Sequence, residues 1–388
     1  MSSRELQASL SLAAIFGLRL FGMFIILPVF SLWAQGRPGW DLQKVGIALG
    51  AYGLTQAILQ IPLGTLSDRH GRKPIMYLGL ACFAAGSFIC ASSASPLIVI
   101  LGRIIQGGGA ISSVAIAAAA DLTSEANRTK AMAIIGSTIG AVFAVSFVAA
   151  PFLTALIGVP GIFALTGVFA LAAMGVVRWL VPQPEQQLAV DRTAGMARVL
   201  LDPELLRLNV GIFSLHAVLM GTFVVVPLAL RQAGVEAAHQ WIVYLGALVA
   251  GVLLMLPGVV GRTATHERTV FLVAIATVGV SLAVLAAGIG HLAGIVAGLV
   301  IFFAGFNVLE AKLPALVSKA APREARGTAT GLYSSVQFLG TFVGGAAGGT
   351  LAQHLGAMAV LLTGLAAMAV WFAVALGMGR YAAAAARR

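Results

Sequence analysis

The sequence consists largely of apolar runs that are each long enough to cross a lipid bilayer. A membrane-spanning helix needs about 20 mostly apolar residues. Twelve runs approach or exceed this length: Leu10–Trp33, Val45–Leu66, Ile75–Ser95, Leu97–Ala120, Ala131–Gly158, Ile162–Val181, Leu208–Leu230, Trp241–Val260, Val270–Ile289, Leu292–Val317, Thr328–Ala352 and Met358–Met378. None of them alternates polar and apolar residues as a transmembrane β-strand does. We therefore predict an all-α integral membrane protein with twelve transmembrane helices.

The composition excludes several other classes of protein. Of the 388 residues, 60% are hydrophobic and 10% are charged, whereas soluble domains carry about 25% charged residues. A soluble enzyme and a disordered chain are therefore excluded. Cys82 and Cys90 are too far apart along one predicted helix to form a disulfide. No Cys/His spacing suits a metal and no nucleotide-binding loop is present, so we expect no metal, no cofactor and no enzymatic activity.

Basic residues are distributed unequally between the gaps that separate the spans. Twelve spans place both termini on one side of the membrane, and 18 of the 24 Lys and Arg residues fall on that side, against 3 on the far side. Because Lys and Arg are enriched in cytoplasmic loops, this bias predicts that both termini are cytoplasmic. It also accounts for the net charge of +11 without nucleic acid as a partner. The first apolar run is too long for a cleavable signal peptide, so we expect a multi-pass protein of the bacterial inner (plasma) membrane.

The longest polar stretch, Val181–Arg207, divides the spans into two sets of six. We predict an N-terminal six-helix half at 1–181, a cytoplasmic linker at 182–207 and a C-terminal six-helix half at 208–388. The linker contains an amphipathic segment, Met196–Leu206, that is suited to a short helix at the membrane interface.

The two halves carry a weak internal repeat. An offset of 198 residues aligns Glu125–Ala131 with Arg323–Ala329, and both segments join the fourth span of a half to its fifth. An even number of spans in each half gives both halves the same orientation. Parallel repeats of this kind predict a substrate path between the halves.

The loop between the second and third spans, Gly64–Lys73, is short and must reverse the direction of the chain. Gly64 allows neighbouring helices to approach closely, and Gly71 favours a tight turn. Asp68 is suited either to accept backbone N–H bonds at a helix start or to pair with Arg72. An ordinary basic cytoplasmic loop with turn glycines is the simpler alternative.

The same loop reads G-x-L-x-D-R-x-G-R-K, which resembles the cytoplasmic loop signature of the major facilitator superfamily. Gly22–Val29 and Val99–Ala110 resemble motifs in the first and fourth spans of its drug:proton antiporters. Phe306–Gly340 is most similar to the tenth and eleventh spans of the YajR-like branch. The resemblance extends over all twelve spans. It implies two parallel-repeat six-helix halves, here without the extra C-terminal cytoplasmic domain associated with YajR-like proteins.

The resemblance also implies a conformational switch around this loop. Asp68, Arg72 and Asp121, the last at the cytoplasmic end of the fourth span, would form a charge-relay cluster. This cluster would latch the outward-facing state against the eleventh span near Gly331, and protonation would weaken it. The residues assigned to the switch are Gly64, Asp68, Arg69, Gly71, Arg72, Lys73 and Asp121. The alternative for Asp121 is a residue that only ends its helix.

The fifth span departs from the antiporter pattern G-x8-G-x3-G-P-x2-G-G. Pro151 keeps its identity, but the glycine positions hold Ser137, Ser146, Ala150, Thr154 and Ala155. Small residues still allow close helix packing. The direction of coupling, antiport or symport, is left open by this departure.

Ionisable residues inside a membrane are costly and mark functional sites by default. Glu310 is the only carboxylate well inside an apolar run, so we expect it to exchange a proton. The alternative is a salt bridge with Arg19 or Lys312, although a residue two positions away on a helix faces elsewhere. Arg103 is interpreted either as a donor to backbone carbonyls or as part of a proton path. The proton-coupling candidates are Glu310, Arg103, Asp68 and His216, with simple hydrogen bonding as the alternative for His216.

We expect a mostly apolar substrate cavity, because few charged residues are present to line it. Arg19 lies too deep in the first span to reach the membrane surface easily, which favours a cavity-facing side chain. The candidate cavity residues are Arg19, Phe24, Gln56, Asn307, Glu310, Tyr333 and Gln337. For the aromatic candidates, plain packing is the alternative.

These features predict a proton-coupled secondary transporter that works by alternating access and exports amphipathic or drug-like small molecules. The alternative is a facilitator or proton symporter of the same fold that imports a small metabolite. The expected partners are a small-molecule substrate, protons and the lipid bilayer, and we expect a monomer. A membrane sensor would need a soluble output domain, and no gap between the spans is long enough to hold one.

Overall fold

The computed structural model describes residues 1–183, 196–259, 267–322 and 325–378, which contain helices and loops but no β-strand. The chain separates into two compact units. Unit 1 comprises Met1–Trp40 and Ile47–Asp191, and unit 2 comprises Asp41–Gly46 and Arg192–Arg388. The limits predicted for the two halves and the linker stay a prediction.

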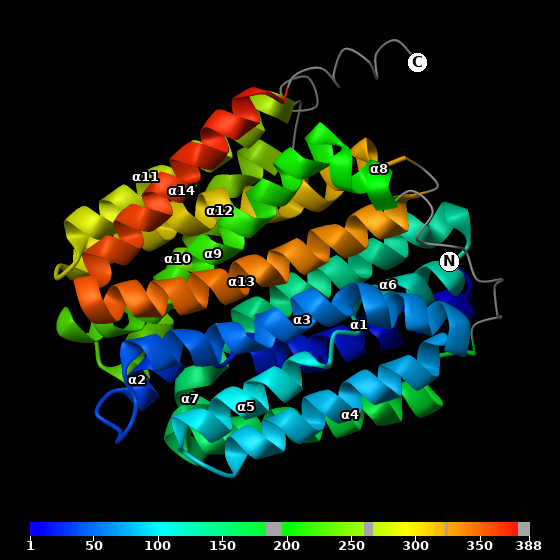
Figure 1. The fold of residues 1–388 in the computed structure, drawn as a ribbon, viewed down its shortest axis with the longest axis horizontal. Helices are drawn as coiled ribbons and strands as arrows, with labels where there is room; N and C mark the ends of the chain where they lie inside the picture. The colour runs from blue at the N-terminus through cyan, green and yellow to red at the C-terminus, as the bar shows by residue number, and fades with distance from the viewer. Residues whose placement is uncertain (184–195, 260–266, 323–324, 379–388) are drawn as a thin grey trace. The chain divides into compact units, whose positions relative to one another are not determined.

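Seven helices build unit 1, except that the first residues of α3 belong to unit 2 (Figure 1). They are α1 (Ser3–Phe24), α2 (Phe30–Ala34), α3 (Leu42–His70), α4 (Arg72–Ala91), α5 (Pro96–Gly107), α6 (Ser112–Asp121) and α7 (Glu125–Trp179). Helices α1 and α4 both pack along α7, and α4 also packs against α5 and α6. Their buried apolar side chains form one core, which includes Leu12, Phe16, Met76, Leu80, Val114, Ala118 and Val177.

The limits predicted for the first span, Leu10–Trp33, are wrong. Helix α1 begins at Ser3, because Ser2 and Glu5 form a reciprocal capping box that satisfies its first N–H groups. It ends at Phe24, and α2 begins at Phe30 after a series of turns. Pro28 explains this end, because proline lacks an N–H and its ring clashes with the carbonyl of the residue four positions earlier, which is Phe24.

The predicted fourth span consists of two helices, α5 and α6, separated by residues 108–111. Consecutive glycines, Gly107–Gly109, interrupt it because glycine has low helix propensity. Close packing accompanies this break. A Cβ added at Gly86 of α4 would overlap the backbone nitrogen of Gln106 and would lie 2.5 Å from the carbonyl oxygen of Gly102. The backbones of α4 and α5 are therefore in direct contact.

Substituting Gly86 by alanine should lower the thermal stability of the purified protein, because overpacking of this kind typically costs about 1–3 kcal/mol. Gly136→Ala is the matched control, since Gly136 also lies inside a helix and a Cβ there would meet nothing within 4 Å. Thermal unfolding in detergent measures both variants. Equal melting temperatures for the two variants would contradict the close contact between α4 and α5.

Helix α7 contains two of the predicted spans. It has 55 residues, which corresponds to about 80 Å at 1.5 Å per residue, far more than the roughly 30 Å thickness of a bilayer core. The helix is interrupted at Gly158, whose φ of 68° and ψ of 173° are not helical, and Pro160 lies two residues further along the chain. The interruption lies at the predicted boundary between the fifth and sixth spans.

Unit 2 contains the remaining helices (Figure 1). They are α8 (Met196–Leu201), α9 (Pro203–Gln232), the short 3-10 helix η1 (Ala237–His239), α10 (Gln240–Val259), α11 (Glu267–Gly288), α12 (Leu292–Ala320), α13 (Arg326–Leu355) and α14 (Ala357–Leu376). Helix α9 packs against α12, α13 and α14, while α11 packs against α12 and α14. Helix α8 occupies only the first part of the predicted amphipathic segment Met196–Leu206, and α9 begins within the rest of it. Residues 184–195 of the linker and 323–324 of the repeat lie outside the described residues.

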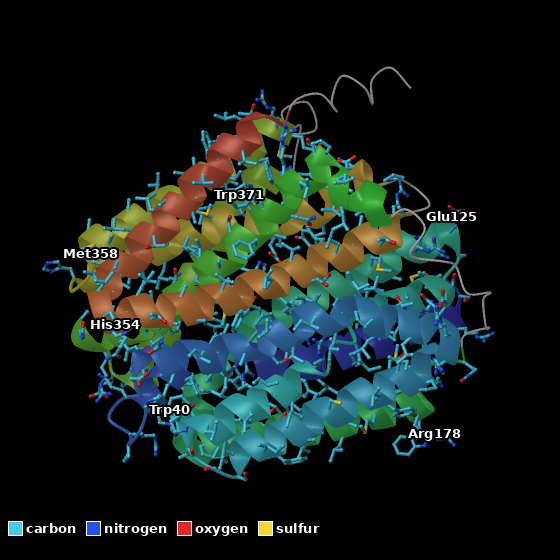
Figure 2. All side chains as sticks on the ribbon, in the orientation of Figure 1. Trp40, Glu125, Arg178, His354, Met358 and Trp371 are labelled. Carbon is cyan, nitrogen blue, oxygen red and sulfur yellow. The ribbon has the colours of Figure 1, made fainter. Side chains whose placement is uncertain are left out.

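A fully buried tryptophan, Trp371, joins three helices in the core of unit 2 (Figure 2). Its indole lies on α14 and contacts α9 at Gly211, where an added Cβ would lie 2.7 Å from the ring. The Phe271 ring of α11 meets it edge-on, with the ring centres 6.0 Å apart. A large aromatic anchor of this kind requires a small residue on the facing helix.

The prediction of twelve spans is confirmed for the described part of the chain. Ten helical segments are long and apolar enough to cross a membrane, and one of these segments contains both α5 and α6. Helix α7 counts among the ten but supplies two spans. Helix α13 is 30 residues long and rich in glycine, which lowers its hydropathy, and it supplies the twelfth span.

Candidate functional site

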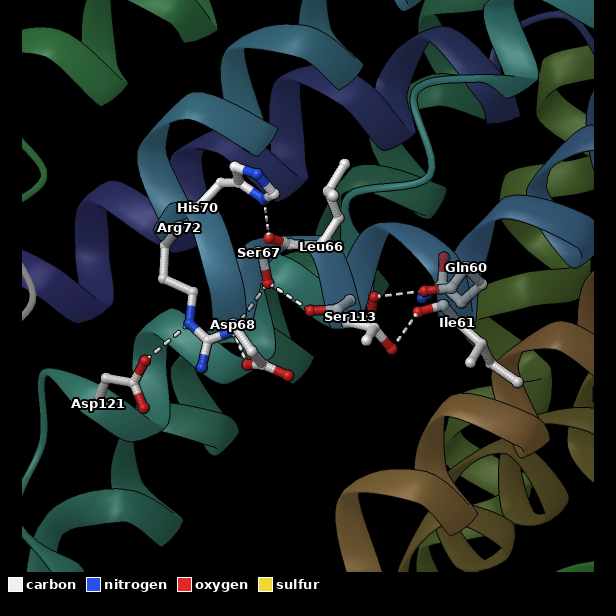
Figure 3. Close-up of polar contacts among 11 residues, drawn as sticks. Gln60, Ile61, Leu66, Ser67, Asp68, His70, Arg72, Ser113 and Asp121 are labelled. Carbon is white, nitrogen blue, oxygen red and sulfur yellow. Dashed lines mark hydrogen bonds and ion pairs between the residues drawn. The ribbon is translucent and has the colours of Figure 1, made fainter. Parts of the chain in front are cut away.

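The predicted switch residues Asp68, Arg72 and Asp121 meet in unit 1, where the ends of α3 and α6 adjoin the start of α4 (Figure 3). Arg72 Nε donates a hydrogen bond of 2.8 Å to Asp121 Oδ2. Its Nη1 donates to Asp68 Oδ1 and, at 2.7 Å, to the Ser67 hydroxyl oxygen. Only 9–13% of each charged side chain is exposed. One guanidinium thus holds two carboxylates in a largely buried network.

The local backbone explains this arrangement. Helix α3 ends at His70, and Gly71 alone connects it to α4 with a φ of 91°. This left-handed conformation is easy for glycine and costly for other residues, as the predicted turn requires. Asp68 lies inside α3 and pairs with Arg72, which is the second of its two predicted roles. Within the described residues, neither Arg69 nor Lys73 hydrogen-bonds to this cluster.

Unit 2 has an ion pair of opposite polarity at the equivalent place. Lys319 Nζ lies 2.9 Å from Glu267 Oε1, and these two residues come from the end of α12 and the start of α11. Asp121 and Arg72 occupy the end of α6 and the start of α4, and the repeat offset of 198 residues places position 121 on position 319. The Lys319 side chain is well exposed, so this pair contributes little stability compared with the buried cluster in unit 1.

Arg103 is buried in unit 1 and all three of its guanidinium nitrogens are hydrogen-bonded. Nε and Nη2 donate to the backbone carbonyls of Ala48 and Leu49, and Nη1 donates to Gln106 Oε1. The guanidinium also lies 4.9 Å from the centre of the Tyr52 ring. These contacts match the structural alternative for Arg103, and its place on a proton path stays a prediction.

Arg19 is also buried in unit 1, with 1% of its surface exposed. Its Nη1 donates to the Ser112 hydroxyl oxygen at 2.7 Å, and its Nη2 donates to the Tyr52 hydroxyl oxygen at 3.0 Å. Gln56 Nε2 donates to the same Tyr52 oxygen at 2.9 Å. The structure thus brings together two predicted cavity residues, Arg19 and Gln56. The third candidate in unit 1, Phe24, is half-buried and packs edge-on against Phe143.

Three residues that take part in these contacts were not predicted from the sequence: Tyr52, Ser67 and Ser112. Tyr52 could have been found, because it precedes Gln56 and Gln60 at successive intervals of four residues and therefore shares one face of α3 with them. Ser67 adjoins Asp68 in the motif. Ser112 has no such signal, since only the packing of α6 against α1 places it next to Arg19.

In unit 2, helices α9, α12 and α13 bring His216, Glu310 and Gln337 together. Gln337 Nε2 lies 2.8 Å from His216 Nε2 and 3.4 Å from Glu310 Oε1. The distance between His216 Nε2 and Glu310 Oε2 is 3.9 Å. Three of the predicted candidates, separated by up to 121 residues along the chain, therefore form one polar cluster.

The cluster has unused hydrogen-bonding capacity. Glu310 Oε2 is buried and has no hydrogen-bond partner among the described residues; the same holds for the amide nitrogen of Asn307 and the Tyr333 hydroxyl. Glu310 forms no ion pair with Lys312 within the described chain, as their spacing of two residues predicted. Unsatisfied buried polar atoms are rare in folded proteins, so this part of unit 2 is suited to receive a proton, water or a polar ligand group.

Protonation of His216 or Glu310 would change the hydrogen bonds that the Gln337 amide can form. Gln337 Nε2 lies next to both His216 Nε2 and Glu310 Oε1, and an amide N–H can donate to His216 Nε2 only while that nitrogen carries no proton. A proton on His216 Nε2 would turn that nitrogen into a donor and require the amide to present its oxygen instead. The Glu310 side chain is 38% exposed and that of His216 12%, so Glu310 is the more accessible of the two.

The comparisons with known proteins identify the family. A family model described as Major Facilitator Superfamily matches residues 12–345. The chain belongs to the Major Facilitator Superfamily. The resemblance of the loop Gly64–Lys73 to that superfamily is therefore confirmed.

The relatives include transporters that match almost the whole chain. The inner membrane transport protein YajR of Escherichia coli is 40% identical over 384 residues, which cover 97% of this chain and 84% of that protein. The multidrug resistance protein MdtH of Aeromonas salmonicida is 27% identical over 343 residues, which cover 87% and 86% of the two chains.

Solved structures support the same fold. A bacterial homologue of the human lysosomal transporter Spinster, in an inward-facing and occupied conformation, superposes with a TM-score of 0.74 at 14% identity and covers 97% of each chain. The nucleoside transporter NupG superposes with a TM-score of 0.73 at 14% identity, covering 96% and 99%. This superfamily member is therefore a multi-pass inner-membrane transporter of small molecules rather than an enzyme.

Proposed function

We propose that this transporter is proton-coupled, works by alternating access and exports amphipathic or drug-like small molecules. The observation that carries the proposal is the contact of His216, Glu310 and Gln337 in the middle of three membrane-spanning helices. A carboxylate in this environment is costly when ionised and unpaired. If Glu310 takes up a proton from one side of the membrane and releases it to the other, the proton gradient is coupled to substrate transport.

The switch cluster of Asp68, Arg72 and Asp121 is proposed as the second protonation-sensitive element. A proton on Asp68 or Asp121 would remove one of the two charge-assisted pairs that hold Arg72. Because a ligand or proton shifts a conformational equilibrium only by its differential affinity for the two states, this loss is a direct way to bias them. Its latch role against the eleventh span stays part of the proposal.

The export of drug-like compounds is supported by two features. Relatives named multidrug resistance protein MdtH match most of the chain. The polar residues in the predicted cavity are few, which suits ligands with a large apolar body. The alternative is import of a small metabolite. In a proton symporter the substrate and protons move in the same direction, so the same assay distinguishes it from export by antiport.

Proteoliposomes that contain the purified protein and an enclosed pH-sensitive dye test this proposal. A panel of drug-like compounds and metabolites is added under an imposed pH gradient, and the internal pH is recorded. We expect drug-like compounds to drive proton movement opposite to their own. Substrate uptake without any change in internal pH would contradict proton coupling, and movement of both in one direction would replace antiport by symport.

We further propose that both termini are cytoplasmic and that the transporter acts as a monomer. The support for the orientation is the excess of Lys and Arg in the gaps on one side of the spans. Single cysteines at position 70 and position 326, in a variant without the native cysteines, should both be labelled only from the cytoplasmic side. Labelling from opposite sides would contradict the topology.

A further inference from the structure

Arg19 is a buried cation without an anion. No carboxylate of the described chain lies within ion-pair distance of its guanidinium, and its Nε has no hydrogen-bond partner among those residues. Its two hydrogen bonds go to the neutral hydroxyls of Ser112 and Tyr52. Arginine keeps its charge in proteins and presents five N–H donors, so most of its donor capacity is unused.

The other buried arginines of unit 1 are satisfied in different ways. Arg72 holds the carboxylates of Asp68 and Asp121. In the described part of the chain Arg103 has no carboxylate partner, but each of its three nitrogens donates to an oxygen, two of which are backbone carbonyl oxygens. Arg19 is therefore the exception among these three. Burying a charge without a counter-charge is costly, and two neutral hydroxyl partners compensate it only in part.

More unsatisfied polar atoms lie along the α3 face that Arg19 contacts. Gln56 binds the same Tyr52 hydroxyl as Arg19, and its Oε1 is buried without a partner in the described chain. Gln60 lies one turn further along α3 and is fully buried. Its Nε2 and Oε1 atoms also have no hydrogen-bond partner among the described residues.

Helix α6 links these groups. Ser112 bonds Arg19, and the adjacent Ser113 donates at 2.8 Å to the Gln60 carbonyl oxygen (Figure 3). Arg19, Gln56 and Gln60 thus adjoin one junction of α1, α3 and α6.

We propose that this junction binds the anionic head group of an amphipathic organic anion and that such anions are the substrate class of the transporter. The Arg19 guanidinium would donate to the head group, and the Gln60 amide supplies a further neutral donor. Helix α1 carries no other charged side chain between Glu5 and its end at Phe24, so the rest of the ligand would contact apolar surface. This inference rests on the proposed export function and names its substrate class.

The test is equilibrium binding to the purified full-length protein in detergent, with probes that differ only in charge. 2-Naphthylacetate carries the anion, 2-naphthylacetamide is its neutral counterpart, and 2-naphthylethylamine is a cationic analogue of similar size. We expect the wild-type protein to bind the acetate at least 10-fold more tightly than the amide or the amine. Arg19→Gln should weaken acetate binding at least 10-fold and leave amide binding unchanged, while Arg19→Lys should keep part of the preference.

Two controls make the result specific. Unchanged amide binding shows that Arg19→Gln is folded, and Arg37→Gln removes an exposed arginine of unit 1 that stacks on Trp33 and should leave both affinities unchanged. Equal affinity of the wild-type protein for the three probes, or unchanged acetate binding in both Arg19 variants, would overturn the inference. The binding assay needs no proton gradient, so its result is independent of the proteoliposome assay. A preference for the acetate without substrate-driven proton movement would reject only the proposed proton coupling. Substrate-driven proton movement without a preference for the acetate would reject only the anion site.

Discussion

Replacing Arg72 by alanine should strongly destabilise the transporter. The substitution leaves Asp68 and Asp121 with their charges largely buried and their common partner removed. Removing one partner of a buried ion pair typically costs about 3–5 kcal/mol, because the remaining charge stays desolvated. We therefore expect a large decrease in the melting temperature of the purified protein and in its yield, together with loss of substrate-driven proton movement in proteoliposomes.

Two further variants serve as comparisons for Arg72→Ala, one at the same position and one at an exposed arginine. Arg72→Lys keeps the charge but loses the planar fork that reaches both carboxylates, so its stability should lie between those of wild type and Arg72→Ala. Arg128→Ala removes an exposed arginine with one long bond, 3.3 Å, to the Ala120 carbonyl oxygen, and should change the stability by less than about 0.5 kcal/mol. If Arg72→Ala melts like wild type, the cluster contributes neither stability nor a switch.

Glu310→Gln should abolish proton-driven transport while leaving the fold intact. The amide has nearly the same shape and can still contact His216 and Gln337, but it cannot release a proton. Losing a proton-transfer group typically lowers rates by about 100-fold or more. We expect gradient-driven substrate accumulation in proteoliposomes to fall by at least that factor, whereas substrate exchange without a gradient should persist.

The matched control for this substitution is Glu236→Gln, since Glu236 is an exposed carboxylate of the same unit. It should accumulate substrate as the wild type does. His216→Gln tests the partner, and a weaker loss than in Glu310→Gln would assign the proton to the carboxylate. Full proton coupling in both Glu310→Gln and His216→Gln would move the coupling site elsewhere in the chain.

Much of the candidate site was predictable, but by two different routes. Asp68, Arg72 and Asp121 were assigned from the resemblance to the superfamily, because a resemblance transfers positions that are far apart in the chain. Glu310 was selected from the residues alone, because a carboxylate inside an apolar run is rare and costly. Neither route indicated that Gln337 would lie between Glu310 and His216, since that depends on how three helices are rotated about their axes.

Some helix ends were likewise predictable from the sequence, and others were not. The interruption at Gly158 falls where the sequence predicted the boundary between two spans, next to Pro160 and Gly161. The end of α1 at Phe24 was missed because the apolar run continues past Pro28. Hydropathy measures the length of an apolar run, but Pro28 removes a backbone donor and crowds the preceding turn without making the run less apolar.

The sequence by itself determined that this protein crosses a membrane twelve times, because the length of each apolar run is a local property set against the thickness of the bilayer. Tertiary structure alone decided which polar side chains face one another. It joined His216 to Gln337, and it left Arg19 with two hydroxyl partners and no carboxylate partner among the described residues. The physical reason is that a buried polar residue is defined by its neighbours on other helices, and those neighbours follow from packing that no single run of residues encodes.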